Sequence, residues 1–479
     1  MRRSLAWIAA EISGSTGVTM ITMLLMARLM TPEQFGTGAL VLGGVAFISL
    51  YVGGFFHDAL IQRANIGDDA FEASLTVTVL AGLAVVALAT LAAILAPAGG
   101  SWSRVGWLFV AASLALPFGG MLGVVSARMR RDLLFSEIAQ SSLVGRLTGC
   151  TIGLGMAHGG FGAVSLVAQA VSDITLQSVM LMARSHWRPK PSLNVAELVT
   201  LCRFALPNAI VHSIAAARLQ GYLLMITGFA SLTATGFVNV AFRITYTPQI
   251  VLATNFTNIV LPILARHQNA PPKMEEAFRL VTRLVLSVTV PIFIGLALVA
   301  DDVVPLLLGR EWISIVQPVQ IMAVGVAIIF LRFPASLVLK ALGNVRLSLL
   351  SNLFQTTVVL LGMAVLQPQD LSAVVALWVL PSVVQLPVAL IVAKCVSRLS
   401  WRAIAIGFLP IFVSILAMTI TVTALAGIAD TKPSPVRLAS RIAFGAGAYA
   451  VTLLLTDHWI RDQLINLVRR MRCALGGVS

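Results

Sequence analysis

The sequence has few charged residues for its length. Of its 479 residues, 33 are Lys or Arg and 19 are Asp or Glu, so charged side chains make up 11% of the chain. Soluble domains carry about 25%. Hydrophobic residues account for 58%. Apolar runs of about twenty residues recur from end to end and leave no stretch long enough for a separate soluble domain. These features exclude an ordinary water-soluble fold.

Cysteine is also scarce, and residues that bind metals or cofactors are not grouped. The four cysteines, Cys150, Cys202, Cys395 and Cys473, stand at no CxxC or metal-ligand spacing, and the six histidines are scattered. The sequence contains no phosphate-binding glycine loop and no nucleophile elbow. We therefore expect inert thiols, no metal, no cofactor and no enzymatic activity.

The apolar runs predict an all-α integral membrane protein of about fourteen transmembrane helices, because each run is long enough to cross a hydrocarbon core of about 30 Å. The N-terminus resembles the basic region of a secretory signal, but Glu11 interrupts its apolar run and no cleavage site follows, so we interpret it as the first helix. The predicted spans cover residues 5–29, 36–58, 73–96, 106–126, 135–156, 160–183, 200–228, 235–264, 282–304, 316–340, 347–367, 371–393, 403–427 and 438–458.

The basic residues are distributed unequally between the two sides of these spans. Most of them fall on the side that holds the N-terminus. The opposite side holds Arg28, Arg104, Arg310, Lys432, Arg437 and Arg441, and Arg146, Arg218, Arg243 and Arg332 fall inside spans. Because cytoplasmic loops are enriched in Lys and Arg, this asymmetry predicts an even number of spans with both termini in the cytoplasm. The location of the basic residues therefore indicates that the net charge of +14 interacts with lipid at the membrane surface and not with nucleic acid.

The order of spans predicts two six-helix lobes in a pseudo-twofold arrangement, followed by two further helices. Gly36 opens the second predicted helix and Gly236 the eighth, each after a long helix and a short outer loop, which is typical of an internal repeat. The predicted parts are an N-lobe at 1–184, a cytoplasmic linker at 185–199, a C-lobe at 200–394, two extra helices at 395–458 and a basic amphipathic tail at 459–479.

Several motifs carry a resemblance to a known family. Arg28-Leu-Met-Thr-Pro-Glu-Gln-Phe-Gly36 is followed by Asp58-Ala-Leu-Ile-Gln-Arg63, and further motifs come in the same order: Trp187-Arg-Pro-Lys-Pro191, Phe204-Ala-Leu-Pro-Asn208, Gly236-Phe-Val-Asn-Val-Ala-Phe-Arg243, Val260-Leu-Pro262 and Leu308-Gly-Arg-Glu-Trp312. Together they resemble the polysaccharide exporter and lipopolysaccharide O-unit type oligosaccharide flippase family, which belongs to the multidrug, oligosaccharidyl-lipid and polysaccharide exporter superfamily.

The resemblance covers roughly residues 1–400 and implies a two-lobed transporter that works by alternating access. The seventh predicted helix departs from the pattern. Relatives commonly carry an acidic residue near its centre, whereas this sequence has Arg218-Leu-Gln-Gly-Tyr222. A coupling role for that acid is therefore not expected here.

Ionisable residues inside the predicted spans are the candidate functional residues, because each costs at least about 2.5–3.5 kcal/mol at the membrane centre and usually faces a cavity or a partner. Arginine stays ionised and binds phosphate oxygens through a fixed fork of donors, while Asn and Gln suit sugar hydroxyls. The predicted substrate-binding residues are Arg146, Arg218, Arg243, Asp173, Gln169, Gln177, Asn239, Asn255 and Gln355. Asp173, Asp58 and Glu11 are candidates for coupling transport to an ion gradient.

An alternative interpretation is that these arginines pair with carboxylates such as Asp173 and Glu11 and only hold the helices together. The residues on the predicted sixth helix include Ser165, Gln169, Asp173 and Gln177 at steps of four, so they share one helix face. We expect that face to point into the protein.

The resemblance and the arginines together predict a flippase. It would carry an undecaprenyl-diphosphate-linked oligosaccharide from the inner to the outer leaflet of the bacterial inner membrane, for exopolysaccharide or lipopolysaccharide assembly. Membrane lipids and polysaccharide polymerase or export proteins are its expected partners, and nucleic acid is not. The alternative is a drug or cation antiporter of the same superfamily, which should have an acidic cavity. An integral-membrane glycan polymerase is disfavoured because the short outer loops carry no paired acids or metal ligands.

Overall fold

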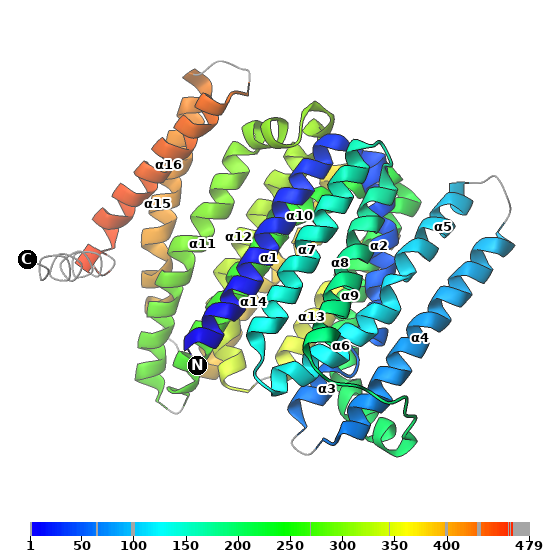
Figure 1. Ribbon diagram of the computed structural model, residues 1–479. Helices are drawn as coiled ribbons and strands as arrows, with labels where there is room; N and C mark the ends of the chain where they lie inside the picture. The colour runs from blue at the N-terminus through cyan, green and yellow to red at the C-terminus, as the bar shows by residue number, and fades with distance from the viewer. Residues whose placement is uncertain are drawn as a thin grey trace, which may run out of the picture. The chain divides into compact units, whose positions relative to one another are not determined.

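The computed structural model describes residues 2–462 except 64–65, 97–100, 269, 344, 398–400, 429–432, 458 and 460. Within these residues the regular structure is helical and no strand occurs (Figure 1). The helices are α1 Arg2–Leu29, α2 Pro32–Val52, α3 His57–Gln62, α4 Asp68–Leu95, α5 Ser101–Ser113, α6 Ala115–Arg131, α7 Phe135–His158, α8 Ala163–Arg184, α9 Val195–Phe229, α10 Leu232–Ala265, α11 Pro271–Leu307, η1 Arg310–Ile315, α12 Val316–Ala341, α13 Val345–Leu366, α14 Leu371–Ser397, α15 Trp401–Ile428 and α16 Pro435–Thr456.

The prediction of an all-helical membrane protein is confirmed, although the count of fourteen spans is not. Among the described residues, eleven helical spans are long and apolar enough to cross a membrane, and the number is twelve if the bent helix α9 is included. The other two predicted spans correspond to α1, of which only Thr16–Leu29 qualifies as a shorter apolar helix, and to α7. α7 carries Glu137, Arg146 and several small or polar residues, which lower its hydropathy.

The chain packs as two compact units. Unit 1 contains Met1–Arg243 and Asn352–Val374, and unit 2 contains Ile244–Ser351 and Val375–Ser479. Unit 1 therefore combines α1–α9 with the first part of α10, most of α13 and the start of α14. The boundaries predicted for the lobes, the linker and the extra helices stay predictions, and most of the predicted amphipathic tail lies outside the described residues.

The start of α2 is explained by its local chemistry. The first N–H groups of a helix have no partner inside the helix, so side chains commonly cap them. Thr31 accepts a hydrogen bond from the Gln34 backbone N–H at 3.3 Å, and the Gln34 side chain accepts one from the Thr31 N–H at 3.2 Å. Pro32 occupies the first helical position, where its missing N–H costs nothing. This capping box fixes where α2 begins.

Glycines bring α7 and α8 of unit 1 together along much of their length. Gly145, Gly149 and Gly153 repeat at steps of four, so they lie on one face of α7. A Cβ at Gly149 would come within 2.6 Å of the backbone oxygen of Gln169, and one at Gly145 within 2.8 Å of that of Asp173. The absence of side chains at these positions lets the backbones approach closely, as in small-residue contacts between membrane helices.

Unit 2 has its own core around α11. Phe293 of α11 stacks on Phe330 of α12, with ring centroids 5.6 Å apart, and both side chains are fully buried. α15 and α16 run side by side and both pack against α11 (Figure 1). The Tyr449 hydroxyl of α16 donates to the Ser287 carbonyl of α11 at 2.9 Å, which fixes α16 near the middle of α11.

Candidate functional site

An ion pair joins two of the predicted site residues in unit 1. Arg146 Nη1 in α7 lies 3.0 Å from Asp173 Oδ2 in α8. Asp173 is 7% exposed, whereas the Arg146 side chain is 32% exposed. Asp173 Oδ1 and Arg146 Nε are buried and have no hydrogen-bond partner among the described residues. The pair is therefore only partly satisfied, which costs free energy unless a ligand or a proton completes it.

A second arginine lies near this pair. Arg243 Nε in α10 donates to Asn239 Oδ1 at 3.2 Å, one turn earlier on the same helix. The Arg243 guanidinium carbon lies 5.9 Å from the ring centroid of Phe35, a buried residue of α2. Arg243 is close enough to Arg146 for the two positive charges to repel each other. In the part of the chain that the structure describes, no carboxylate is paired with Arg243.

We refer to Arg146, Asp173, Asn239 and Arg243 as the arginine cluster. It contains two guanidinium groups and one carboxylate, so one positive charge remains without a counter-charge. Charge interactions are strong in the low dielectric of a membrane protein. Such a cluster attracts an anion, and the two planar forks offer bidentate hydrogen bonds to phosphate or carboxylate oxygens.

The third predicted arginine, Arg218, has a different contact. Arg218 Nη1 in α9 donates to Gln355 Oε1 in α13, 137 residues along the chain. One turn further along α9, the fully buried Tyr222 hydroxyl donates to the Val374 carbonyl at 3.0 Å. Both predicted residues, Arg218 and Gln355, are thus brought together within unit 1.

The remaining predicted residues are placed as follows. Gln169 Nε2 donates to Cys150 Sγ at 3.6 Å, and Gln177 lies one turn beyond Asp173 on the face of α8 that packs on α7. Asn255 lies in the part of α10 that belongs to unit 2 and is half-buried. The side chain of Glu11 lies outside the described part of the structure.

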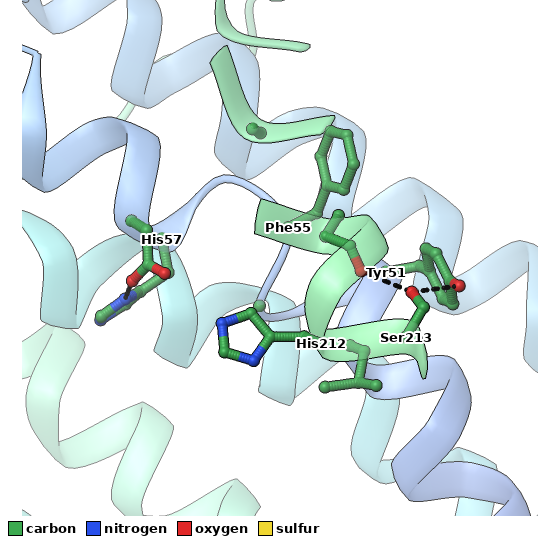
Figure 2. A pocket seen from close by; sticks show the side chains of 10 residues that line it. Tyr51, Phe55, His57, His212 and Ser213 are labelled. Atoms are coloured by element: carbon green, nitrogen blue, oxygen red, sulfur yellow. Dashed lines mark hydrogen bonds and ion pairs between the residues drawn. The ribbon is translucent and has the colours of Figure 1, made fainter. Parts of the chain in front are cut away.

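A cavity of about 270 Å³ lies elsewhere in unit 1, between α2, α3 and α9 (Figure 2). The coupling candidate Asp58 is part of its wall, and its Oδ1 lies 3.1 Å from His57 Nδ1. The lining residues are Leu50, Tyr51, Gly54, Phe55, His57, Asp58, Ala205, Ala209, His212 and Ser213.

Comparison with known proteins identifies the family. Residues 25–317 match the family described as "Polysaccharide biosynthesis protein". The chain belongs to this family. The matched segment contains the whole arginine cluster and Arg218, whereas Gln355 and the helices α13–α16 lie beyond it. The resemblance inferred from the sequence motifs is therefore confirmed.

Relatives match all or nearly three quarters of this polysaccharide biosynthesis family member. The succinoglycan biosynthesis transport protein ExoT of Rhizobium meliloti is 22% identical over 493 residues, which cover 100% of this chain and 98% of that protein. The lipopolysaccharide biosynthesis protein WzxC of Escherichia coli is 22% identical over 355 residues, 73% of this chain and 72% of that protein.

A solved structure establishes the fold to which the family member belongs. The lipid II flippase MurJ in an inward closed conformation superposes with a TM-score of 0.74 at 12% sequence identity, over 95% of this chain and 99% of that one. The predicted fold class, an all-α multi-helix integral membrane fold, is confirmed by this match.

Sequence reasoning missed a group of buried charges in unit 2. Arg441 of α16 is 4% exposed and its Nη1 donates to Asp301 Oδ1 at 2.9 Å, while Asp302 beside it is fully buried. Arg437 contributes further ion pairs to both aspartates. From their positions in the sequence, both arginines were expected only as charges on the outer side of the membrane. Two features of the sequence could have predicted this group of charges. Asp301 and Asp302 are adjacent near the end of one apolar run, and Arg437 and Arg441 lie four residues apart at the start of another.

Proposed function

We propose that this chain flips a lipid-diphosphate-linked oligosaccharide from the inner to the outer leaflet of the bacterial inner membrane, by alternating access, for exopolysaccharide or lipopolysaccharide assembly. Membership of the polysaccharide biosynthesis family and a fold like that of the lipid II flippase MurJ support a transporter of this class. The observation that carries the proposal is the excess positive charge of the arginine cluster.

The charge of the cluster distinguishes between the candidate ligands. A lipid diphosphate concentrates negative charge and several acceptor oxygens at one point of an otherwise apolar or sugar-rich molecule. Arg146 and Arg243 supply positive charge and donors, and Asn239 orients Arg243. A cation or drug antiporter needs the opposite, since its carboxylates must outnumber its fixed cations. The cluster therefore favours the diphosphate over a cationic substrate.

Asp173 has a defined role in this proposal. Without ligand, it pairs with Arg146 and limits the cost of burying that charge. A diphosphate that binds Arg146 displaces Asp173, whose carboxylate then lies buried without a counter-charge and takes up a proton. When the diphosphate leaves on the other side, Asp173 releases that proton and pairs with Arg146 again. The ligand and the Asp173 carboxylate compete for one guanidinium group, so ligand binding promotes proton binding and the proton moves outward together with the diphosphate.

The remaining predicted residues complete the proposed substrate path. Hydrogen-bond donors and acceptors for sugar hydroxyls come from Gln169, Gln177, Asn255 and Gln355. Arg218 donates further hydrogen bonds to the diphosphate. The lipid tail stays in the bilayer while the polar head crosses. Both termini lie in the cytoplasm, and a polysaccharide polymerase or export protein takes over the oligosaccharide on the outer side.

The proposal is tested by surface-glycan export in cells that lack this chain and are complemented with single variants. Arg146→Ala, Arg218→Ala and Arg243→Ala each remove charge-assisted hydrogen bonds worth about 1.5–3 kcal/mol, so export should fall by roughly 10- to 100-fold at equal protein level. Arg146→Lys and Arg243→Lys keep the charge but lose the fork, and we expect intermediate export.

The matched control is Arg104→Ala, because Arg104 is an exposed arginine at the start of α5. It should export normally. Lipid-linked oligosaccharide should accumulate on the cytoplasmic leaflet in the strains with defective variants. Normal export by all three Arg→Ala variants would contradict the proposed function.

A further inference from the structure

The cavity between α2, α3 and α9 is not part of the proposed diphosphate-binding site. It is built from different helices than the arginine cluster, which comes from α7, α8 and α10. Its lining residues on α9 lie on both sides of a sharp bend, where the segments Val195–Pro207 and His212–Phe229 differ in direction by 63°. Pro207 interrupts the backbone hydrogen bonds of α9 at this point. The bend places His212 and Ser213 at the cavity wall (Figure 2).

The hydrogen bonds already made in the wall determine what it offers a ligand. The Ser213 hydroxyl donates to the Ala209 carbonyl at 2.6 Å. Because a serine hydroxyl has only one proton, the 2.6 Å bond between Tyr51 Oη and Ser213 Oγ must be donated by Tyr51. The proton of Tyr51 is thus engaged, and its oxygen lone pairs remain as acceptors.

The His57 and Asp58 pair leads to the same conclusion. His57 Nδ1 lies 3.1 Å from Asp58 Oδ1, and a carboxylate only accepts, so Nδ1 carries the proton. Asp58 Oδ2 remains as an acceptor. Asp58 and Tyr51 thus present acceptors, His212 adds a ring N–H donor, and the lining residues include no Lys or Arg side chain.

This chemistry fits a sugar better than a phosphate group. A diphosphate is an acceptor with high negative charge, so the Asp58 carboxylate and the lone pairs of Tyr51 would repel it. Sugar hydroxyls donate hydrogen bonds and carry no charge, and the C–H face of a sugar ring packs on aromatic side chains. Tyr51 and Phe55 supply such aromatic surface (Figure 2).

The size of the cavity sets the size of the ligand. Its volume of about 270 Å³ lies just below the roughly 300–1,000 Å³ of pockets that enclose a drug-sized molecule. It holds one sugar unit and not a whole oligosaccharide. Tyr51 is 45% exposed, so the cavity is reachable from outside the protein core.

We propose that this cavity is a separate subsite that binds one uncharged sugar unit of the transported oligosaccharide, while the arginine cluster holds the diphosphate. The inference rests on the proposed flippase function. The cavity recognises the glycan, and the arginines bind the diphosphate, which every lipid-linked substrate shares.

The test compares two lipids on the purified full-length chain in lipid nanodiscs. One probe is undecaprenyl diphosphate without sugar, and the other is the lipid-linked oligosaccharide pool extracted from cells that lack this chain. Dissociation constants give the ratio of affinities, which measures the contribution of the glycan. The wild-type chain should bind the glycosylated lipid at least tenfold more tightly.

Cavity variants and arginine variants should differ in this assay. Tyr51→Phe, which keeps the ring, and His212→Ala should reduce the ratio several-fold and leave binding of the sugar-free lipid unchanged, which also shows that the variants are folded. Arg146→Ala should weaken binding of both lipids equally. His158→Ala, a matched change of an exposed histidine at the end of α7, should leave both constants unchanged.

Each other outcome contradicts one of the two proposals. An unchanged ratio in Tyr51→Phe and His212→Ala, or an equal loss for both lipids, would overturn the sugar subsite and leave the flippase proposal standing. Binding of tetraphenylphosphonium by the wild-type chain that the cavity variants abolish would assign the cavity to a cation instead. Binding of neither lipid by the wild-type chain would overturn the flippase proposal and the subsite with it.

Discussion

Gly36 of α2 and Gly236 of α10 are in direct backbone contact within unit 1. A Cβ at Gly36 would overlap the Leu232 carbonyl oxygen and lie 2.8 Å from the Gly236 nitrogen, and a Cβ at Gly236 would overlap the Pro32 carbonyl oxygen. The same two glycines were matched to each other from the sequence, as the openings of two helices that correspond in the predicted repeat. Two positions that the predicted repeat treats as equivalent therefore meet each other.

This contact predicts a large effect of a single methyl group. Gly36→Ala and Gly236→Ala should each reduce the free energy of unfolding by about 1–3 kcal/mol, because the backbone atoms they would overlap cannot move as a side chain can. Thermal unfolding of the purified protein in detergent measures the effect. Gly228→Ala is the matched control, since nothing lies within 4 Å of a Cβ there. Equal unfolding temperatures for all three variants would argue against the contact.

The packing of α7 on α8 makes a second prediction, which concerns the site. Gly149→Ala should separate the two helices, because its Cβ would lie 2.6 Å from the Gln169 oxygen and 2.9 Å from the Asp173 Cβ. The Arg146 and Asp173 pair should then be disturbed, and both glycan export and thermal stability should fall. Gly155→Ala on the same helix has open space and should behave as wild type. Export by Gly149→Ala at the control level would show that the site tolerates the separation.

Asp173 provides a prediction about coupling. Asp173→Asn removes the carboxylate that competes with the ligand for Arg146, so binding of undecaprenyl diphosphate should become tighter or stay unchanged. Transport in proteoliposomes should lose its dependence on the proton gradient, because the amide has no proton to exchange. The measurement is the initial flipping rate over a series of imposed gradients. If Asp173→Asn responds to the gradient as the wild type does, Asp173 is not the coupling residue.

The buried ion pairs of unit 2 predict a different pattern of stability. Arg441→Met alone leaves the fully buried Asp302 without one of its partners and should cost about 3–5 kcal/mol of folding free energy. The double variant Arg441→Met with Asp302→Leu replaces the pair by apolar groups and should recover most of that loss. Asp301 keeps its contact with Arg437 in both. Unfolding temperatures and protease cleavage around α16 distinguish the variants, and equal loss in both would indicate that the pair itself is needed.

The site was partly predictable because membrane burial makes charged residues conspicuous. Arg146, Asp173, Arg218 and Arg243 stand out in apolar runs as single expensive residues. Their partners did not follow from the sequence, since Gln355 is 137 residues from Arg218 and Phe35 is 208 residues from Arg243. The cavity at the bend of α9 was not predicted either, because His57, His212 and Ser213 carry no spacing pattern that relates α2, α3 and α9.

The sequence by itself determined that this protein is an all-helical membrane protein of the polysaccharide biosynthesis family. Those conclusions depend on local properties, namely apolar length, scarcity of charge and short motifs. Tertiary structure decided which charges are paired and which stay in excess, where glycines allow two backbones to touch, and where a cavity opens. These features depend on contacts between residues far apart in the chain. Such contacts are determined by how whole helices pack together, and no single stretch of sequence determines them.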